Sequence, residues 1–326
     1  MKIVIPGGSG HVGMVLSRAF HAAGDEVVVL TRRPCPAAWR MVEWDGQTLG
    51  AWITELEGAD AVINLAGRSV NCRYNAENRR QIMDSRVHSA RAIGQAISRS
   101  AHPPRVWLQM ATATIYAHRF DAANDEATGV LGGHEFNAPS TWRFSIDVAT
   151  AWEQSASEAA TPKTRKVLLR SAMVMSPDRG GIFDTLLTLV RRSVGGHAGN
   201  GRQYVSWIHE MDFVNAIEWL ISHENFRGPV NLASPNPIPN AQFMRELRSA
   251  WGVRFGLPAP AWLLEIGAVF LRTETELILK SRRVVPTRLL QSGFEFRYPN
   301  WVDAAKELCN RSRQPSNHSN NPVHSI

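Results

Sequence analysis

The chain has 326 residues, enough for one large hydrophobic core accompanied by a smaller second domain. Hydrophobic residues make up 44% of it, no apolar run is long enough to cross a bilayer, and no signal peptide is visible, so we expect a cytoplasmic protein without membrane contact. The net charge of +7 comes with scattered arginine pairs but no nucleic-acid-binding motif or basic stripe, so we expect no nucleic-acid partner.

Strand-like and helix-like stretches alternate through the first two thirds of the chain. Apolar runs predict strands at residues 2–6, 26–32, 106–117 and 166–177 and another within 60–67, and helical spacing predicts helices at 14–24, 80–98 and 145–159. Alternation of this kind is typical of a parallel sheet with helices on both faces. We therefore predict an α/β fold, a Rossmann-type doubly wound parallel sheet.

The last quarter of the chain changes character at Pro235. Prolines at 235, 237 and 239 precede two predicted helices joined by a proline-rich link. The end of the chain is rich in Ser, Asn and Pro, with almost no apolar residue to bury. We predict three parts: a sheet domain over residues 1–234, a small, mainly helical C-terminal domain over 235–308, and a disordered tail over 309–326.

The three cysteines lie far apart in the sequence. Cys35, Cys72 and Cys309 form no CxxC or Cys/His pattern, so neither a disulfide framework nor a metal site is expected. We predict free thiols.

The first predicted strand runs into the glycine-rich stretch GGSGHVG, directly before a predicted helix. It satisfies GxxGxxG, counted through Gly7, Gly10 and Gly13. Glycines at these spacings allow a tight turn, a close approach of a pyrophosphate to the backbone and close packing of helix on strand. The amino terminus of the helix offers N–H groups and a partial positive charge to the phosphates. The stretch predicts a dinucleotide site; the alternative is a tight turn that holds no ligand.

The end of the second predicted strand indicates which dinucleotide is bound. Where NAD binders usually place an acidic residue, this chain has Thr31, Arg32 and Arg33. A guanidinium can bind a 2′-phosphate through two hydrogen bonds, whereas a carboxylate would repel it. We predict NADP(H) as the cofactor, with Thr31 and Arg32 at the 2′-phosphate. The alternative is an arginine that is merely exposed in a loop.

Further motifs give the chain a family resemblance. With MVEWDG and the strand end NLAG added, it resembles an extended short-chain dehydrogenase/reductase of the NAD-dependent epimerase/dehydratase superfamily. The similarity is closer to an atypical, epimerase-like subgroup with a small C-terminal domain of unknown function, and it rests on the ordered motifs DSR, FSIDVATAWE, LLRSAMVMSP, GRQYVSWIHEMD and QSGFEFRYP. The resemblance covers roughly residues 1–308 and implies a substrate region built mainly from the C-terminal third.

The resemblance also assigns cofactor contacts, position by position. It implies pyrophosphate contacts at the three glycines and 2′-phosphate contacts at the end of the second strand, as above. Other cofactor contacts are implied along the path to the nicotinamide, at Leu65, Ala66, Gly67, Arg86 and Val174. Trp44 and Asp45 are weaker candidates for the adenine end.

The catalytic pattern of the superfamily is incomplete. Ordinary members use a Ser/Thr together with a YxxxK pair, in which the lysine lowers the pKa of the tyrosine. Here the tyrosine position holds Ser145, an unactivated hydroxyl on which turnover should not depend, and the lysine position holds Ala149. The remaining candidates for acid/base chemistry are Thr112, Tyr116 and His209.

Each of these three candidates has a structural alternative. Thr112 can be an ordinary strand residue, Tyr116 can be a core residue, and His209 can organise a loop. Asp212, a little further on, is expected to cap a helix.

Two functions fit these observations. The first is an NADP(H)-dependent oxidoreductase or epimerase-like enzyme acting on a small carbonyl or alcohol. A nucleotide-sugar substrate is disfavoured because Val205 stands where the epimerases usually carry a diphosphate-binding arginine, although Arg202 remains a candidate anion contact. The alternative is a cofactor-binding sensor without turnover. A polar lining beside the nicotinamide would favour chemistry, and an apolar lining would favour the sensor. The sequence indicates no oligomeric state.

Overall fold

The computed structural model of the chain describes residues 1–135, 139–260 and 276–314. Its centre is a seven-stranded sheet with the order β10-β6-β5-β4-β1-β2-β3, in which every neighbouring pair is parallel. The strands are β1 (Lys2–Pro6), β2 (Glu26–Thr31), β3 (Arg40–Glu43), β4 (Ala61–Asn64), β5 (Val106–Thr112), β6 (Arg165–Ser171) and β10 (Gly228–Leu232). The predicted doubly wound α/β fold is confirmed.

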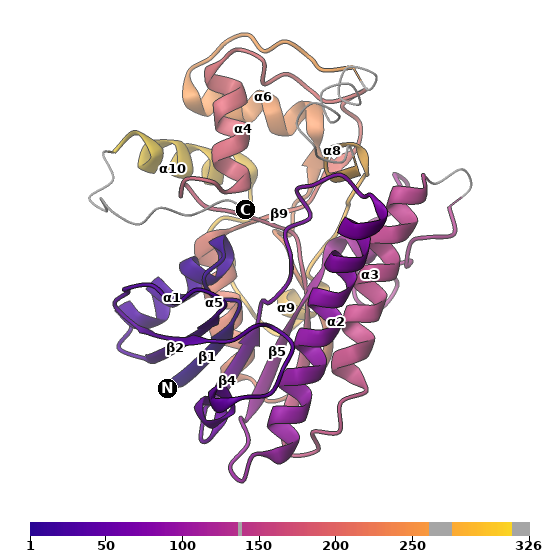
Figure 1. Ribbon diagram of the computed structural model, residues 1–326. Coiled ribbons are helices and arrows are strands. Elements are labelled where there is room, and N and C mark those ends of the chain that lie inside the picture. The colour runs from indigo at the N-terminus through magenta and orange to yellow at the C-terminus, as the bar shows by residue number, and fades with distance from the viewer. Residues whose placement is uncertain (136–138, 261–275, 315–326) are drawn as a thin grey trace.

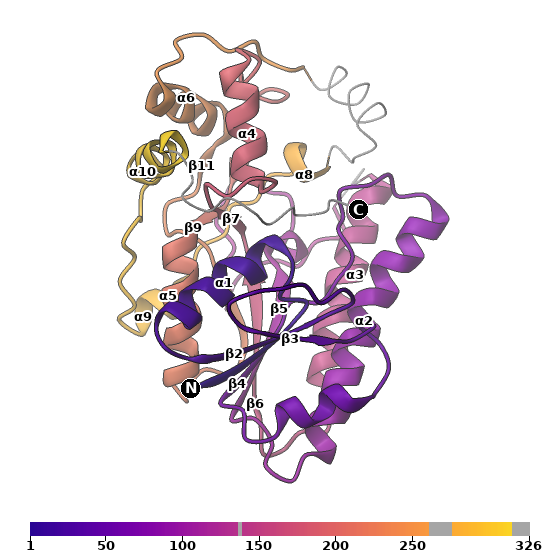
Figure 2. The same ribbon diagram turned by 60° about the vertical axis from the view of Figure 1, so that its left-hand side comes forward.

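Long helices cover both faces of the sheet (Figures 1 and 2). One face carries α1 (His11–Ala22) and α5 (Glu210–Ser222), and the other carries α2 (Ala76–Arg99) and α3 (Ser140–Ser157). Successive residues of a strand point to opposite faces, so Ile3 and Ile5 pack with the first pair of helices while Val4 packs on the other side with Trp107 and Trp152. Burial on both sides explains why the strands are continuously apolar.

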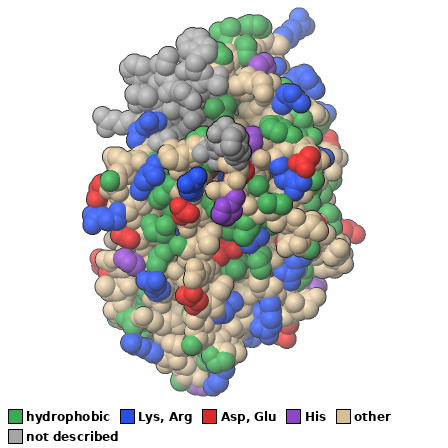
Figure 3. Space-filling view, turned by 90° about the vertical axis from the view of Figure 1, so that its right-hand side faces the viewer, with side chains coloured by type: hydrophobic (Ala, Val, Ile, Leu, Met, Phe, Trp, Pro, Cys, Tyr) green, Lys and Arg blue, Asp and Glu red, His purple; other side chains and the backbone are tan. Residues whose placement is uncertain are grey.

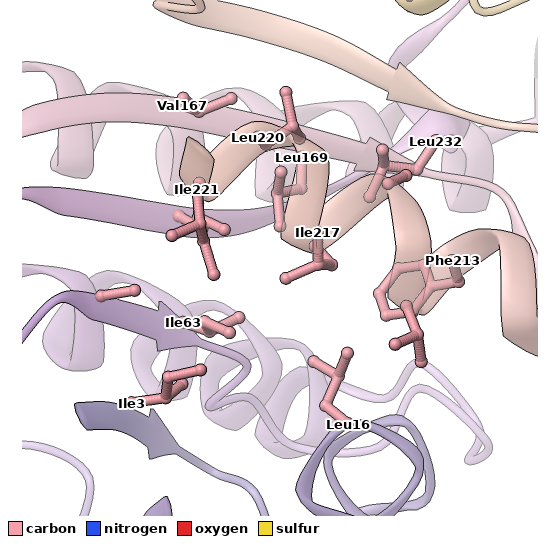
Figure 4. Packing of buried hydrophobic residues seen from close by; sticks show 14 of the residues in the cluster. Ile3, Leu16, Ile63, Val167, Leu169, Phe213, Ile217, Leu220, Ile221 and Leu232 are labelled. Carbon is pink, nitrogen blue, oxygen red and sulfur yellow. The ribbon is translucent and has the colours of Figure 1, made fainter. Parts of the chain in front are cut away.

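The packing between α5 and the sheet is seen from close by in Figure 4. Phe213 and Ile217 of α5 reach toward Leu16 of α1 and Ile63 of β4, and all four are fully buried. Full burial of such a side chain contributes about 1.5–3 kcal/mol. This core fixes the glycine turn after β1 relative to the end of β4.

A second lobe stands over the carboxyl ends of the strands. It contains α4 (Ile182–Arg191), α6 (Asn240–Trp251) and α10 (Trp301–Arg313) (Figure 1). Two small sheets tie it to the rest, β7 (Met173–Met175) with β9 (Trp207–His209) and β8 (Tyr204–Val205) with the antiparallel β11 (Ile238–Pro239). Trp301 is stacked on Phe243 at 3.9 Å and packs edge-on against Trp207 at 5.0 Å. Segments from both sides of residue 234 therefore share one core, and a division there remains a prediction.

The start of the predicted tail is corrected by α10. The helix continues to Arg313, so residues 309–313 are ordered in a helix rather than part of a loose tail. Cys309 is fully buried, and the Arg313 guanidinium donates to the carbonyls of Ala250 and Trp251 and lies 4.5 Å from the Trp251 ring. The composition of this stretch did not reveal these contacts, because it has few apolar residues and the cysteine at its start is buried like one of them. The rest of the predicted tail, 315–326, lies outside the described residues.

A segment late in the chain, residues 276–285, runs between the second lobe and the sheet. It begins with α8 (Glu276–Leu279) and is followed by α9 (Thr287–Gln291). Hydrogen bonds fix it on both sides: Ser281 N to His118 Nδ1 (2.8 Å), Arg282 N to the Tyr204 carbonyl (2.9 Å), Val284 N to Ser206 Oγ (2.9 Å), and Asn124 N to the Arg283 carbonyl (2.7 Å). We call residues 276–285 the crossing segment.

Three further expectations concern the thiols, the membrane and the surface charge. All three cysteines are free, as predicted, with Cys35 exposed and Cys309 buried. None of the helices in the described ranges is long and apolar enough to span a bilayer. On the face shown in Figure 3, Lys and Arg side chains are mixed with acidic and apolar ones and form no continuous stripe.

Candidate cofactor and substrate site

The glycine turn lies where the order of the sheet reverses. From β1 the chain passes to β2 and β3 on one side and then returns to β4 on the other side of β1. In open α/β sheets, ligands bind in the crevice at this point, beyond the carboxyl ends of the strands. The turn joins β1 to α1, and α1 begins after Gly10 without any side-chain cap, so its first N–H groups face that crevice.

Two of the three predicted glycines are required by the fold itself. Gly7 has a φ of +76°, and a Cβ there would lie 2.6 Å from the Cα of Ala66. At Gly13 a Cβ would lie 2.4 Å from the Cα of Gly8. Gly10 differs, because a Cβ there would meet only the Gly7 carbonyl oxygen at 3.6 Å. The chain itself therefore leaves room for a side chain at Gly10, at the point where the turn meets the crevice.

The end of β2 meets the glycine turn through hydroxyl groups. Thr31 is buried, and its Oγ1 lies 2.9 Å from Ser9 Oγ and accepts a hydrogen bond from Arg33 N. The Arg32 side chain is exposed. Thr31 and Arg32 thus lie beside the turn, as expected. Ser9 was not predicted, although it occupies a variable position of the glycine motif.

The two weaker candidates for the adenine end are engaged within their own turn. Trp44 is buried, lies 4.9 Å from the ring of Trp52 and donates to the Thr48 carbonyl. Asp45 accepts hydrogen bonds from the backbone N–H groups of Gln47 and Thr48 and from the Thr48 hydroxyl, and these hold the pKa of Asp45 below its usual value. Both side chains shape the loop after β3.

A half-buried arginine of α2 lies beside the loop that follows β4. Arg86 of α2 packs under Gly67, where a Cβ would lie 3.3 Å from its Cγ. Its guanidinium donates to the carbonyls of Arg68 and Ile82 and lies 4.9 Å from the ring of Trp152. Burial lowers the pKa of Arg86 to about 10, which leaves it charged at neutral pH. No ion pair with a carboxylate balances this charge within the described ranges, and a largely desolvated cation of this kind favours an anion nearby.

Three other residues were predicted to contact the cofactor, and two of them lie beside the glycine turn whereas the third lies in the core. Leu65 donates its N–H to the Pro6 carbonyl and Ala66 donates to Asn64 Oδ1, so both are fixed beside the turn. Val174 lies in β7, opposite Ile208 of β9, and is buried in the main core.

Two of the three candidates for acid/base chemistry are enclosed by structural partners. The Tyr116 hydroxyl donates to Asn231 (2.9 Å) and accepts from Arg170 (3.0 Å), and burial raises the pKa of Tyr116. His209 is fully buried, accepts from Met211 N and lies 2.8 Å from a Glu307 oxygen. These contacts favour the structural alternative for both residues.

His209 also corrects the expected helix cap. It is the N-cap of α5, whereas the Asp212 carboxylate accepts the backbone N–H groups of Arg297 and Tyr298 at 2.7 and 2.9 Å. Asp212 therefore joins α5 to the C-terminal part of the chain instead of capping the helix. The sequence could not reveal that the Asp212 carboxylate accepts a hydrogen bond from a backbone N–H group 85 residues away.

Polar side chains gather at the end of β5. Thr112 is half-buried, and its Oγ1 accepts a hydrogen bond from Thr114 N. Ser145 of α3 is also half-buried, and its hydroxyl donates to a Glu276 oxygen from the crossing segment, a partner that was not predicted. Ala149, where a lysine is usual, is buried in a small cluster that includes Ala113 and Val284.

A lysine nevertheless lies at this edge of the sheet. Lys280 of the crossing segment is fully buried, donates through Nζ to the Thr114 carbonyl at 2.9 Å, and lies 3.9 Å from Glu276 Oε1. Burial lowers the pKa of Lys280 to about 8. Arg282 adds a hydrogen bond from its Nε to the Thr114 hydroxyl at 3.2 Å. Glu276, Lys280 and Arg282 were not predicted because they match no spacing motif. Only the fold brings them beside the end of β5.

The sequence of this chain is similar to known protein families and to individual proteins of other organisms. A family model described as the NAD dependent epimerase/dehydratase family matches residues 3–233, and a domain of unknown function, DUF1731, matches residues 259–308. The epimerase family protein SDR39U1 of Homo sapiens is 28% identical over 311 residues, covering 94% of this chain and 99% of that protein. An epimerase family protein of Staphylococcus epidermidis is 29% identical over 307 residues, covering 94% and 98%.

The fold of this chain is also similar to that of solved structures. Human SDR39U1, isoform 2, crystallised with NADPH, superposes with a TM-score of 0.82 at 27% identity, covering 95% of this chain and 99% of that one. A nucleoside-diphosphate sugar epimerase from Corynebacterium glutamicum superposes with a TM-score of 0.73 at 25% identity, covering 94% of this chain and 58% of that one.

Proposed function

This chain belongs to the NAD dependent epimerase/dehydratase family, as an atypical short-chain dehydrogenase/reductase, and on this basis we propose that it binds NADP(H) and oxidises or reduces a small alcohol or carbonyl. The observation that carries the proposal is the glycine turn at the reversal point of the sheet, with Thr31 and Arg32 beside it. The NADPH in the structure of the human relative is consistent with this assignment.

The residues present fit the phosphates of the cofactor. In this proposal the turn holds the pyrophosphate, and Ser9, Thr31 and Arg32 hold the 2′-phosphate. The half-buried charge of Arg86 attracts the anionic ligand from beneath Gly67. Gly10, which the fold does not require, allows close approach of the pyrophosphate. When bound, the nicotinamide supplies or accepts a hydride.

The substrate side favours chemistry over the sensor alternative. Thr112, Ser145, Glu276 and Lys280 make the edge of β5 polar, whereas a sensor without turnover would be expected to fill it with apolar side chains. Val205 is buried in β8 and Arg202 is exposed, so a diphosphate finds no buried cation at these positions. A small carbonyl or alcohol suits such a site better than a nucleotide sugar.

The cofactor assignment is tested by titrating the protein with NADPH and NADH. We expect tighter binding of NADPH, and Arg32→Ala should weaken it by about 1.5–3 kcal/mol, roughly 10- to 150-fold, since a hydrogen bond to a charged group is lost. NADH affinity should stay nearly unchanged. Arg33→Ala, which removes the neighbouring exposed arginine, is the matched control. Equal titration curves for the two cofactors would contradict the proposal.

The reaction is tested by a screen of small aldehydes, ketones and alcohols, with NADPH absorbance and product mass as readouts. Turnover of any member at a rate above that of heat-denatured protein supports the enzyme. Tight NADPH binding with no turnover across the whole panel would favour the sensor instead.

A further inference from the structure

We propose that Ser145, Glu276 and Lys280 form a proton relay that replaces the missing tyrosine and lysine, with Ser145 as the group that touches the reacting oxygen of the substrate. This inference rests on the proposed NADP(H) function. It assigns to the crossing segment a chemical role, because two of the three residues belong to it.

The three side chains are connected from α3 into the interior. Ser145 Oγ donates to Glu276 Oε2, and Glu276 Oε1 lies 3.9 Å from Lys280 Nζ. Lys280 is anchored to the carbonyl of Thr114, two residues beyond the end of β5. Figures 1 and 2 show α8, which begins with Glu276, beside the end of α3 that faces the second lobe. The relay therefore stands at the carboxyl edge of the sheet, where the substrate is expected.

Burial increases along the relay. Ser145 is half-buried, whereas the side chains of Glu276 and Lys280 have no exposed surface. Of the three relay residues, only Ser145 is therefore within reach of a substrate oxygen, and the two ionisable groups act from behind it. Water is kept from the carboxylate and the amine, which strengthens the interaction between them.

The surroundings of Lys280 set how easily it loses its proton. Desolvation lowers its pKa most, the carboxylates of Glu276 and Glu135 raise it, and the guanidinium of Arg282 lowers it. His118 and the ring of Trp142 also face it, the ring at 6.0 Å from Nζ. With a pKa of about 8, Lys280 is divided between amine and ammonium near physiological pH, as a proton donor and acceptor should be.

Proton transfer through the relay balances as follows in the direction of alcohol oxidation. The substrate hydroxyl gives its proton to Ser145 Oγ as Ser145 gives its own to Glu276, and Glu276 passes a proton to the neutral amine of Lys280. The hydride goes to the bound nicotinamide, so the products are the carbonyl compound, the reduced cofactor and a Lys280 ammonium. Carbonyl reduction reverses every transfer. The 3.9 Å between Glu276 Oε1 and Lys280 Nζ exceeds a hydrogen bond, so the last transfer requires a small rotation of the Lys280 side chain toward Glu276.

The relay carries a different charge in the two redox states. With Lys280 neutral the trio has a net charge of −1, which matches an oxidised, positively charged nicotinamide. With Lys280 protonated its net charge is zero, which matches the reduced, neutral ring. Binding NADP⁺ should therefore expel a proton from Lys280, and binding NADPH should not.

Proton release on cofactor binding tests the relay without a known substrate. Isothermal titration calorimetry at pH 8, in two buffers of different ionisation enthalpy, measures the protons released by NADP⁺ and by NADPH. We expect NADP⁺ to release roughly a few tenths of a proton more than NADPH, because Lys280 is half-protonated at this pH. Lys280→Met should abolish the difference.

Lys166→Met is the matched control. The pKa of Lys166 is also lowered by burial, but its Nζ donates to the carbonyls of Ala156, Ser157 and Ala159 at the other end of α3. This variant should keep the full difference between the cofactors. Should Lys280→Met fail to fold, Lys280→Arg retains the charge and does not titrate in this range, and it too should abolish the difference.

Equal proton release for the two cofactors in the unaltered protein would overturn the relay, and so would a difference that survives removal of Lys280. Failure of both cofactors to bind would be a different result, since it would overturn the proposed NADP(H) function and the relay together. A pH-independent difference in affinity would leave cofactor binding intact and still exclude Lys280 as the titrating group.

Discussion

The glycine turn and the crossing segment lie at the same edge of the sheet, but the turn is local and the crossing segment is not. Gly7, Ser9 and Thr31 are brought together by β1 and β2, neighbouring strands that follow each other in the chain. Ser145 and Glu276 are 131 residues apart, and Lys280 reaches Thr114 across 166 residues. A cofactor site of the first kind is readable as a motif, whereas groups of the second kind meet only through the fold.

The largest expected effect tests the contact between Ser145 and the crossing segment. With a substrate from the screen, Ser145→Ala should lower kcat by a factor on the order of 10² to 10⁴, since loss of one acid/base contributor has this effect. NADPH affinity should remain unchanged, which separates a chemical role from binding. The control is Ser157→Ala near the far end of the same helix, where the hydroxyl donates only to the Glu153 carbonyl. Full activity of Ser145→Ala would show that the serine at this position is dispensable.

The next effect tests the local region with two glycines of one turn. Gly7→Ala should destabilise the protein by about 1–2 kcal/mol from the positive φ alone, and by more because of the contact with Ala66. Gly10→Ala should change stability by about 1 kcal/mol or less but weaken NADPH binding at least roughly tenfold, because the added methyl group occupies the approach of the pyrophosphate. Denaturant unfolding and NADPH titration of both variants measure the two effects. Unchanged NADPH affinity in Gly10→Ala would contradict the proposal that the pyrophosphate binds at this turn.

The extent to which sequence predicts this molecule follows the same division. The glycine turn and most strands of the central sheet were predictable because short stretches of sequence indicate them, although β10 at one edge was not predicted. The role that we propose for Ser145 was not predictable, because the sequence does not reveal that its hydroxyl donates to Glu276. Tyr116 looked available on its strand, but Asn231 and Arg170 from two other strands occupy its hydroxyl.

The smallest effect concerns the boundary of the ordered chain. Truncation after Leu308 removes buried Cys309 and the contacts of Arg313 with Trp251, so we expect the melting temperature to fall by several degrees, at about 2–4 °C per kcal/mol lost. Truncation after Gln314 removes twelve residues with almost no apolar side chains and should leave it unchanged. Differential scanning calorimetry of both products measures the difference. Identical melting curves for the two truncations would mean that the last turn of α10 contributes nothing.

The distance along the chain between α3 and the crossing segment has a consequence during synthesis. The glycine turn and the strands that border it are complete in the sequence by residue 64, long before the crossing segment is synthesised. Ser145 gains its carboxylate only after residue 276, and the lysine behind it four residues later. A chain that ends before residue 276 would therefore carry the glycine turn but lack two of the three residues of the proposed relay. If the proposed relay carries the reaction, turnover requires that synthesis has passed Lys280.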